Sequence, residues 1–301
     1  MSGGGAHGRA GPTGLVVVDK PGAMTSHDVV ARARRALGTR KVGHAGTLDP
    51  MATGVLVLGV GRATRLLGHL LATEKTYVAT ARLGVSTTTD DAEGEVTGAT
   101  PAGQLAEHDI RSALARFVGD IEQVPTDVSA IKVDGRRAYE RVRAGEEVEL
   151  PARPVTVHEI EVHDVRSVAD FTDVDFSVRC SSGTYVRALA RDLGAALGVG
   201  GHLIALRRTA VGAFGLDVAV TLEDLAERGK EALVPIAAAA RDTFDSRDLD
   251  DALAADVRFG RQLRIDLPDG IPVAVFAPDG EFLALYERKS QGVAAAVAVF
   301  V

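Results

Sequence analysis

Asp49 has the strongest case for chemistry in this 301-residue chain, because it is a lone carboxylate in a basic stretch. Between residues 31 and 65 there are seven lysines and arginines and one acid, Asp49. Nearby cations favour the charged form of a carboxyl group, so we expect Asp49 to ionise readily. The same cations would attract a polyanion. An acid weakens the binding of a polyanion, and its presence here therefore favours a catalytic role.

The segment that carries Asp49, from Lys41 to Gly54, is rich in glycine and precedes an apolar run at Val55–Leu58. Asp-Pro is by itself a common turn dipeptide, so a purely structural turn is the competing interpretation. Three glycines in the segment permit positive φ or a close approach of the backbone. A loop shaped in this way beside a buried strand is a usual place for a catalytic group.

The segment resembles the signature of the TruB family of tRNA pseudouridine synthases, G-H-x-G-T-L-D-P-x-A-T-G, which is present from Gly43 to Gly54. Further blocks resemble the family in the same order, over about 200 residues in all. The five blocks are Val18–Ser26, Gly43–Gly54, Lys75–Asp91, Gln123–Tyr139 and Ser182–Thr209. The chain departs from the pattern at Thr126-Asp127-Val128, where the family more often has a second proline and an aromatic residue. It also has Gly201 where alanine is usual.

The resemblance implies an α+β protein with a pseudouridine synthase fold, in which a central, mainly antiparallel sheet carries the active site in a cleft. It also implies a small β-rich, PUA-like domain at the C-terminal end. The expected activity is the isomerisation of uridine 55 in the T-arm of tRNA, with no cofactor and no metal. The partner would be the T-stem-loop, and the protein is expected to be a cytoplasmic monomer.

The reaction needs a group that attacks or deprotonates the substrate, and we assign this role to Asp49. Whether it attacks the ribose, attacks the base or removes a ribose proton stays open. Arg187 is expected to keep Asp49 charged and oriented through its planar fork, although it could instead pair with a surface acid. Tyr77 is expected to stack on the uracil and to handle its C5 proton; a core tyrosine is the alternative.

Four further residues complete the expected pocket. Tyr185 and Leu206 would line it, and Asp91 would organise it by polar pairing. Asp91 could alternatively be the second carboxylate of a glycosidase, because such enzymes usually need two. The uracil must leave its stack before it reacts, and His44 could fill the vacated space. A histidine with a structural role is the competing interpretation.

Contacts with RNA phosphates are expected from basic residues in several of these blocks. The expected residues are Lys20, Arg62, Arg65, Lys132, Arg207 and Arg208. Residues 130–152 are rich in both signs of charge and resemble a mobile insertion that closes over RNA in the family. A solvated helix with i,i+4 ion pairs is equally consistent with that pattern.

The net charge of −7 does not exclude RNA, because its distribution is uneven. Residues 1–210 carry 25 basic and 25 acidic residues, whereas residues 211–301 carry 9 and 16. Binding depends on local potential, so we expect a limited basic face. The one cysteine, Cys180, can form no internal disulfide and is expected to be a buried, inert thiol. No apolar run approaches the roughly 20 residues that span a bilayer.

The hydrophobic pattern predicts a mixture of strands and helices. Strands are expected at Leu15–Val18, Tyr77–Leu83, Glu93–Val96, Val155–Val165, Asp173–Arg179, Pro272–Phe276, Phe282–Tyr286 and Val293–Val301. Helices are expected from Ser26, as N-cap, to Leu37, at 107–118, at Tyr185–Leu197 and within 215–248. The expected domains are a disordered tail at 1–12, a catalytic domain at 13–240 and the C-terminal domain at 249–301.

A nucleotide-binding enzyme is the remaining alternative, suggested by Gly59-Val60-Gly61. The fingerprint G-x-G-x-x-G is incomplete there, because Thr64 stands at the position of the third glycine. A non-catalytic RNA-binding protein is disfavoured by the presence of Asp49, Tyr77 and Arg187 together.

Overall fold

The computed structural model describes residues 11–126, 132–133, 136–137 and 150–301. The tail predicted at 1–12 lies almost entirely outside these residues, and so does most of the insertion predicted at 130–152. Lys132 belongs to a two-residue strand, β8 (Lys132–Val133), that pairs with β9 (Arg136–Arg137). Its side chain lies outside the described part of the chain.

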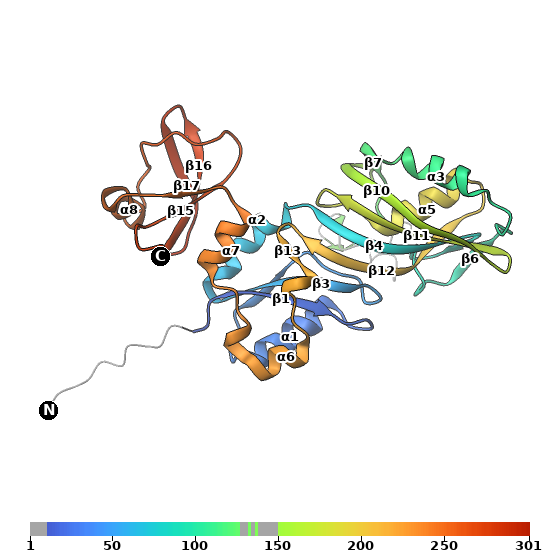
Figure 1. Cartoon of the computed structure of the whole chain (residues 1–301), viewed down its shortest axis with the longest axis horizontal. Coiled ribbons are helices and arrows are strands. Elements are labelled where there is room, and N and C mark those ends of the chain that lie inside the picture. Colours follow the sequence, from blue (N-terminus) through green and yellow to red (C-terminus); the bar gives the residue numbers. More distant parts are fainter. Residues whose placement is uncertain (1–10, 127–131, 134–135, 138–149) are drawn as a thin grey trace.

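A mixed sheet forms the centre of the molecule, and the described residues contribute nine strands to it (Figure 1). The main order is β1 (Gly14–Lys20), β3 (Thr53–Val60), β12 (Gly201–Val211), β4 (Lys75–Leu83), β11 (Phe171–Cys180), β10 (Arg153–Val168) and β7 (Gly119–Gln123). Two short strands join it, β2 (Val42–Ala45) beside β3 and β13 (Phe214–Gly215) beside β12. Each of these pairs is antiparallel except β3 with β12, which is parallel. The predicted α+β class is confirmed.

Helices cover the two halves of this sheet separately (Figure 1). The helices α3 (Glu107–Ala115) and α5 (Val186–Ala196) pack on the half that contains β4, β10 and β12. The helices α1 (Ser26–Ala36) and α6 (Leu222–Arg228) pack beside β1 and β2. The described residues also form the helical segments η1 (Gly61–Leu66), α2 (Leu67–Leu71), η2 (Leu216–Val218), η3 (Gly229–Ala232), α7 (Ile236–Thr243) and α8 (Asp251–Arg258).

Two predicted element boundaries are wrong for local reasons. Thr25, not Ser26, is the N-cap of α1, because its side chain and that of Asp28 form a reciprocal capping box. Ser26 is buried, and its hydroxyl group is used elsewhere. The strand expected at Glu93–Val96 begins only at Val96, as β6 (Val96–Ala99), beside β5 (Val85–Thr87). The backbone N–H of Glu93 instead donates to Asp91, within a turn.

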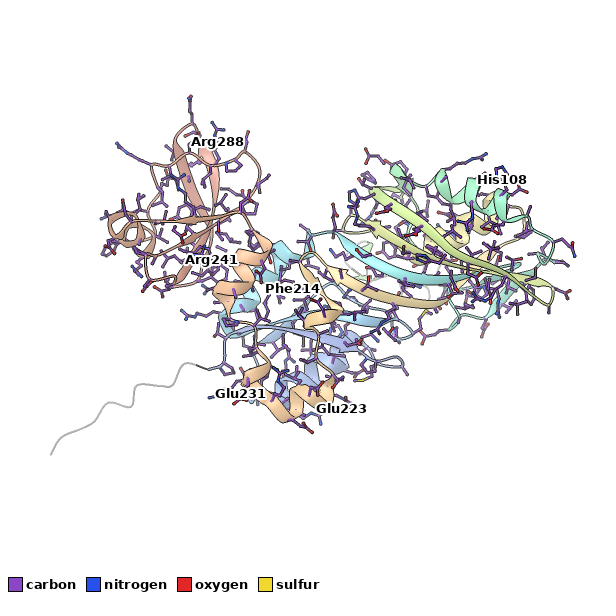
Figure 2. All side chains as sticks on the ribbon, viewed as in Figure 1. His108, Phe214, Glu223, Glu231, Arg241 and Arg288 are labelled. Atoms are coloured by element: carbon purple, nitrogen blue, oxygen red, sulfur yellow. The ribbon has the colours of Figure 1, made fainter. Side chains whose placement is uncertain are left out.

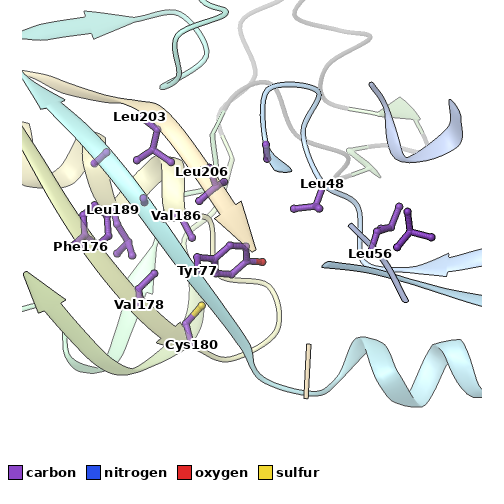
Figure 3. Packing of buried hydrophobic residues seen from close by; sticks show 14 of the residues in the cluster. Leu48, Leu56, Tyr77, Phe176, Val178, Cys180, Val186, Leu189, Leu203 and Leu206 are labelled. Atoms are coloured by element: carbon purple, nitrogen blue, oxygen red, sulfur yellow. The ribbon is translucent and has the colours of Figure 1, made fainter. Parts of the chain in front are cut away.

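Alternate residues of the central strands build the main core, as Figure 3 shows for Phe176 and Val178 of β11, and Leu189 of α5 belongs to the same cluster. Cys180 ends β11 and is 1% exposed, so the predicted burial is confirmed. Burial raises the pKa of its thiol to about 11, which keeps it protonated and unreactive at neutral pH. Tyr77 lies at the edge of this core, with its hydroxyl oxygen on the side away from Phe176 and Leu189 (Figure 3).

Helix α5 approaches β12 so closely that only glycine fits at the contact. A Cβ atom on Gly194 would lie 2.1 Å from the carbonyl carbon of Gly200, and one on Gly201 would lie 2.4 Å from the oxygen of Ala190. The glycine at 201, where the resemblance leads one to expect alanine, is therefore matched to this packing. The close contact fixes α5, which carries Arg187, against the central sheet.

The C-terminal part of the chain forms its own four-stranded sheet, in the order β14 (Ser246–Asp248), β15 (Val273–Phe276), β16 (Phe282–Ser290) and β17 (Val293–Val299). An apolar cluster that includes Leu15, Leu66 and Phe300 joins this sheet to the central one. Arg241 lies at the junction (Figure 2). Its guanidinium carbon is 3.8 Å from the ring centre of Phe276.

Candidate active site

A cavity of about 300 Å³ opens where the Asp49 loop meets β4, β12 and the start of α5. Six of the residues singled out from the sequence line it: Asp49, Tyr77, Tyr185, Arg187, Leu206 and Arg208. They come from three separate sequence blocks, and the topology of the central sheet brings them together. The cavity lies within the range of small-ligand pockets, about 300–1,000 Å³.

Three buried side chains hold the backbone of the loop that carries Asp49. The hydroxyl group of Ser26 accepts a hydrogen bond from the N–H of Leu48 at 2.9 Å and donates to its carbonyl at 3.1 Å. The guanidinium of Arg208 donates to the carbonyl of Gly46 at 3.1 Å. The amine of Lys20 donates to the carbonyl of Pro50 at 3.2 Å. The backbone is thus fixed on both sides of Asp49.

Arg187 joins Asp49 to Asp91 in a buried network. Its Nε and Nη2 atoms lie 3.0 and 3.3 Å from the two carboxylate oxygens of Asp49, the fork expected of an arginine–carboxylate pair. Its Nη1 atom lies 3.2 Å from a carboxylate oxygen of Asp91 and 2.7 Å from the carbonyl oxygen of Thr89. Arg187 is 5% exposed, whereas about a third of the Asp49 side chain is exposed, at 35%.

The expectation that Asp49 ionises readily is wrong in its direction. Burial raises the pKa of Asp49 above its ordinary value, and Arg187 opposes this effect without cancelling it. The nearby charge of Asp91 raises the pKa further. Sequence reasoning counted the cations around Asp49 but had no measure of the water that the fold removes from it.

The two tyrosines of the cavity differ in their surroundings. Tyr77 is 9% exposed, and burial raises the pKa of its phenol group, which is therefore neutral at physiological pH. Tyr185 is the residue before the first turn of α5. The side chain of Gln123 accepts from the N–H of Tyr185 at 2.8 Å and donates to its carbonyl at 3.1 Å.

Asp91 does not line the cavity and is 3% exposed. Besides Arg187 it accepts hydrogen bonds from the hydroxyl group of Thr89 at 2.5 Å and the N–H of Glu93 at 3.1 Å. A carboxylate engaged in this way has no access to a sugar in the cavity. The glycosidase alternative for Asp91 is therefore wrong, and its geometry is that of polar organisation.

His44 lies in β2, outside the lining of the cavity, with its ring edge-on to that of His27 at 5.6 Å between centroids. Burial lowers the pKa of His44, so its ring is neutral at physiological pH. A role in base extrusion stays a prediction.

Lys20 and Arg208 are wrong as phosphate contacts, because both are buried. Lys20 is fully buried, and its amine donates to the carbonyl groups of Pro21, Met24 and Pro50. Arg208 is 1% exposed and also donates to carbonyl groups. Both cations serve the Asp49 loop.

The other predicted phosphate contacts lie nearer the surface. Arg207 lies on the opposite face of β12 from Arg208, and its side chain forms an ion pair with Asp19 at 2.7 Å. It therefore points away from the cavity. Arg62 and Arg65 donate to the carbonyl oxygens of Phe300 and Val299 at 2.8 and 2.6 Å. These two arginines hold the C-terminal sheet, and as exposed side chains they stay predicted RNA contacts.

Sequence reasoning missed Ser26, Gln123 and Lys75 as residues of the site, although all three fall within the blocks that resemble the family. Lys75 lines the cavity, and its amine donates to the carbonyl oxygens of Leu71 and Thr73, both at 2.6 Å. Burial lowers its pKa to about 8. For Ser26, Gln123 and Lys75, the one sequence signal of a role in the site is their position inside a block that resembles the family.

The nucleotide-binding alternative fails on packing. Gly59 lies within β3, and a Cβ atom there would be 2.9 Å from the carbonyl oxygen of Ala63 in η1. The glycine therefore serves helix–strand packing.

Among the described residues, no cluster of three or more histidine, cysteine or acidic side chains is placed to hold a metal ion. None of the helices in that part of the chain is both long and apolar enough to cross a membrane.

The fold has close counterparts among solved structures. A chain in an H/ACA ribonucleoprotein bound to a substrate RNA containing 2'-deoxyuridine matches with a TM-score of 0.73 at 27% identity, over 96% of this chain and 85% of that one. The mixed sheet and this likeness give the chain the pseudouridine synthase fold, as the resemblance implied.

Comparisons of the sequence with family models identify the family to which the chain belongs. Residues 34–186 match the model of the TruB family pseudouridylate synthase N-terminal domain. Residues 187–238 match that of the tRNA pseudouridylate synthase B C-terminal domain, and residues 244–301 that of the tRNA pseudouridine synthase II C-terminal region. The chain belongs to the TruB family of pseudouridylate synthases. It is 60% identical to the tRNA pseudouridine synthase B of Nocardia farcinica, over 92% of this chain and 90% of the relative. Identity to the enzyme of the same name from Arthrobacter sp. (strain FB24) is 55%, over 96% of both chains.

Proposed function

We propose that this protein converts uridine 55 in the T-arm of tRNA to pseudouridine, with Asp49 as the catalytic carboxylate. The observation that carries the proposal is the buried fork of Arg187 on Asp49 at the wall of the cavity. Tyr77 and Leu206 supply apolar surface to the same cavity, and a pyrimidine could lie against it. The family of the chain supports an RNA substrate, and its relatives are named for tRNA.

The reaction breaks the bond between N1 of uracil and C1′ of ribose and forms a bond between C5 and C1′. C5 loses a proton and N1 gains one, so the change is an isomerisation and consumes no other reactant. Asp49 acts in its ionised form. Because burial raises its pKa, the guanidinium of Arg187 is what makes ionisation accessible at neutral pH. Tyr77 stacks on the uracil and handles the C5 proton.

The target uridine is stacked in folded tRNA, and we propose that it is extruded into the cavity before it reacts. His44, neutral and close to the Asp49 loop, fills the place that the base leaves. Arg62, Arg65 and Lys132 contact the phosphates. The protein acts as a monomer and uses no cofactor.

The test is tritium release from tRNA that carries 5-tritiated uridine, under single-turnover conditions, for the wild type and for Asp49→Asn. The wild type is expected to release tritium and the variant to release none, with RNA affinity within about tenfold, or roughly 1.4 kcal/mol. Mass-spectrometric mapping should place the pseudouridine at position 55. Free uracil in the products would indicate hydrolysis, and a fully active Asp49→Asn variant would remove the carboxylate from the mechanism.

A further inference from the structure

Arg208 and Tyr77 occupy directly opposite positions on neighbouring strands. They are register partners in the antiparallel pair of β12 and β4, and both side chains line the cavity. Opposite residues on one face of such a pair have their Cβ atoms about 4.5–5.5 Å apart, within reach of long side chains. Arg208 is 1% exposed, so its charge acts inside the protein and not in solvent.

The same guanidinium reaches the Asp49 loop on both sides of the carboxylate. Nη2 and Nη1 donate to the carbonyl oxygens of Gly46 and Thr47 at 3.1 and 3.5 Å, and Nε donates to that of Val55 at 2.7 Å. The loop also returns against the Arg208 backbone, since a Cβ atom on Gly54 would lie 2.1 Å from the Arg208 carbonyl oxygen. An arginine offers five donors in a fixed plane, and here they are directed both to the loop and to Val55 in β3, which follows it.

We propose that Arg208 is a positioning residue of the reaction, which holds the Tyr77 ring and the backbone around Asp49 in one fixed arrangement. The inference rests on the proposed function, in which Tyr77 and Asp49 act on the same nucleoside. In support, the charge of Arg208 and its hydrogen bond lower the pKa of the Tyr77 phenol, against the larger effect of burial. A lysine at 208 would keep the positive charge, but a single amine cannot span Gly46, Val55 and Tyr77.

The experiment compares Arg208→Lys with Arg82→Lys. Arg82 is a matched control: it lies on the same strand as Tyr77 and makes a two-pronged contact with Asp173 at 2.8 and 2.9 Å, outside the cavity lining. Single-turnover tritium release should fall by about 100-fold or more for Arg208→Lys, with RNA affinity within about threefold. Arg82→Lys should keep both quantities within about threefold of the wild type.

A double-mutant cycle with Tyr77→Phe separates positioning from general support of the fold. Because Arg208 acts partly through Tyr77, the loss caused by Arg208→Lys should be at least about threefold smaller in the Tyr77→Phe background. If the fold-losses of activity caused by Arg208→Lys and Tyr77→Phe simply multiply in the double variant, Arg208 does not act through Tyr77. An Arg208→Lys variant as active as the control, or one that does not fold, would also overturn the proposal. A wild type that releases no tritium overturns the proposed function first, and this inference with it.

Discussion

Replacing Arg187 tests the site most directly, because this side chain alone joins the two carboxylates of the described site. Arg187→Lys keeps the positive charge but loses the fork on Asp49. A lysine amine, with three donors on one atom, cannot reach Asp49, Asp91 and Thr89 in the way that the guanidinium does. The carboxylate of Asp49 then loses its fixed orientation.

The size of the effect follows from the two hydrogen bonds that Arg187 donates to Asp49. A hydrogen bond to a charged group contributes about 1.5–3 kcal/mol. Loss of two such bonds at the lower value is about 3 kcal/mol, which corresponds to roughly 150-fold in rate where the variant loses that stabilisation in the transition state and not in the ground state. RNA affinity should change little, since Arg187 is 5% exposed and faces Asp49.

Arg187→Met adds a test by pH. Arg187 lowers the pKa of Asp49, so its removal raises that pKa further. The acid limb of the single-turnover rate should therefore move to higher pH in Arg187→Met and move less in Arg187→Lys. Arg166→Lys, at a surface pair with Asp164, is the control and should leave both rate and limb unchanged. If Arg187→Lys retains the rate within about threefold, or the limb of Arg187→Met stays in place, then Arg187 does not act on Asp49 in the way argued above.

Three further changes have expected outcomes. Asp49→Asn should raise the melting temperature at pH 7. The pKa of Asp49 is higher in the folded than in the unfolded wild type, so ionisation of Asp49 lowers the stability of the wild type as pH rises. Calorimetry should therefore show that the gain of the variant over wild type shrinks towards pH 4. Lys20→Met removes three partly buried hydrogen bonds, at about 1 kcal/mol each, and should lower the melting temperature by roughly 6–12 °C. An unchanged melting temperature would contradict the structural role of Lys20. Phe300→Ala should lower the free energy of unfolding by about 3–5 kcal/mol, because it opens a cavity at the junction of the two sheets. Limited proteolysis between residues 243 and 250 should become faster. An unchanged proteolysis rate would show that Phe300 does not hold the two sheets together.

The sequence was sufficient to bring Asp49, Tyr77 and Arg187 together, because the blocks that contain them resemble a single family. Their geometry could not be obtained in the same way. The fork of Arg187 and the exclusion of Asp91 from the cavity depend on how the turn at Thr89–Asp91 packs against α5. Those contacts join residues about 100 positions apart, and no local pattern contains them.

The errors that concern charged side chains have one physical origin, which is burial. Sequence reasoning assigns Lys20 and Arg208 to phosphates, because cations are usually exposed. Alternation along β12 places Arg207 on one face and Arg208 on the other, but sequence alone does not say which face is covered. The pKa of Asp49 departs from the sequence prediction for the same reason, because desolvation depends on the packing around the loop.

Burial of these cations also accounts for RNA chemistry in a chain of net charge −7. Four cations, Lys20, Lys75, Arg187 and Arg208, lie in or directly behind the cavity. The described acids that face them are Asp49, Asp91 and Glu93. Charges in a partly dry site act more strongly than charges in water. The local potential around Asp49 is therefore set by these few side chains, whose donors fix the Asp49 loop and the cavity wall. The excess of acid is in residues 211–301, with 16 acidic and 9 basic residues, none of which lines the cavity.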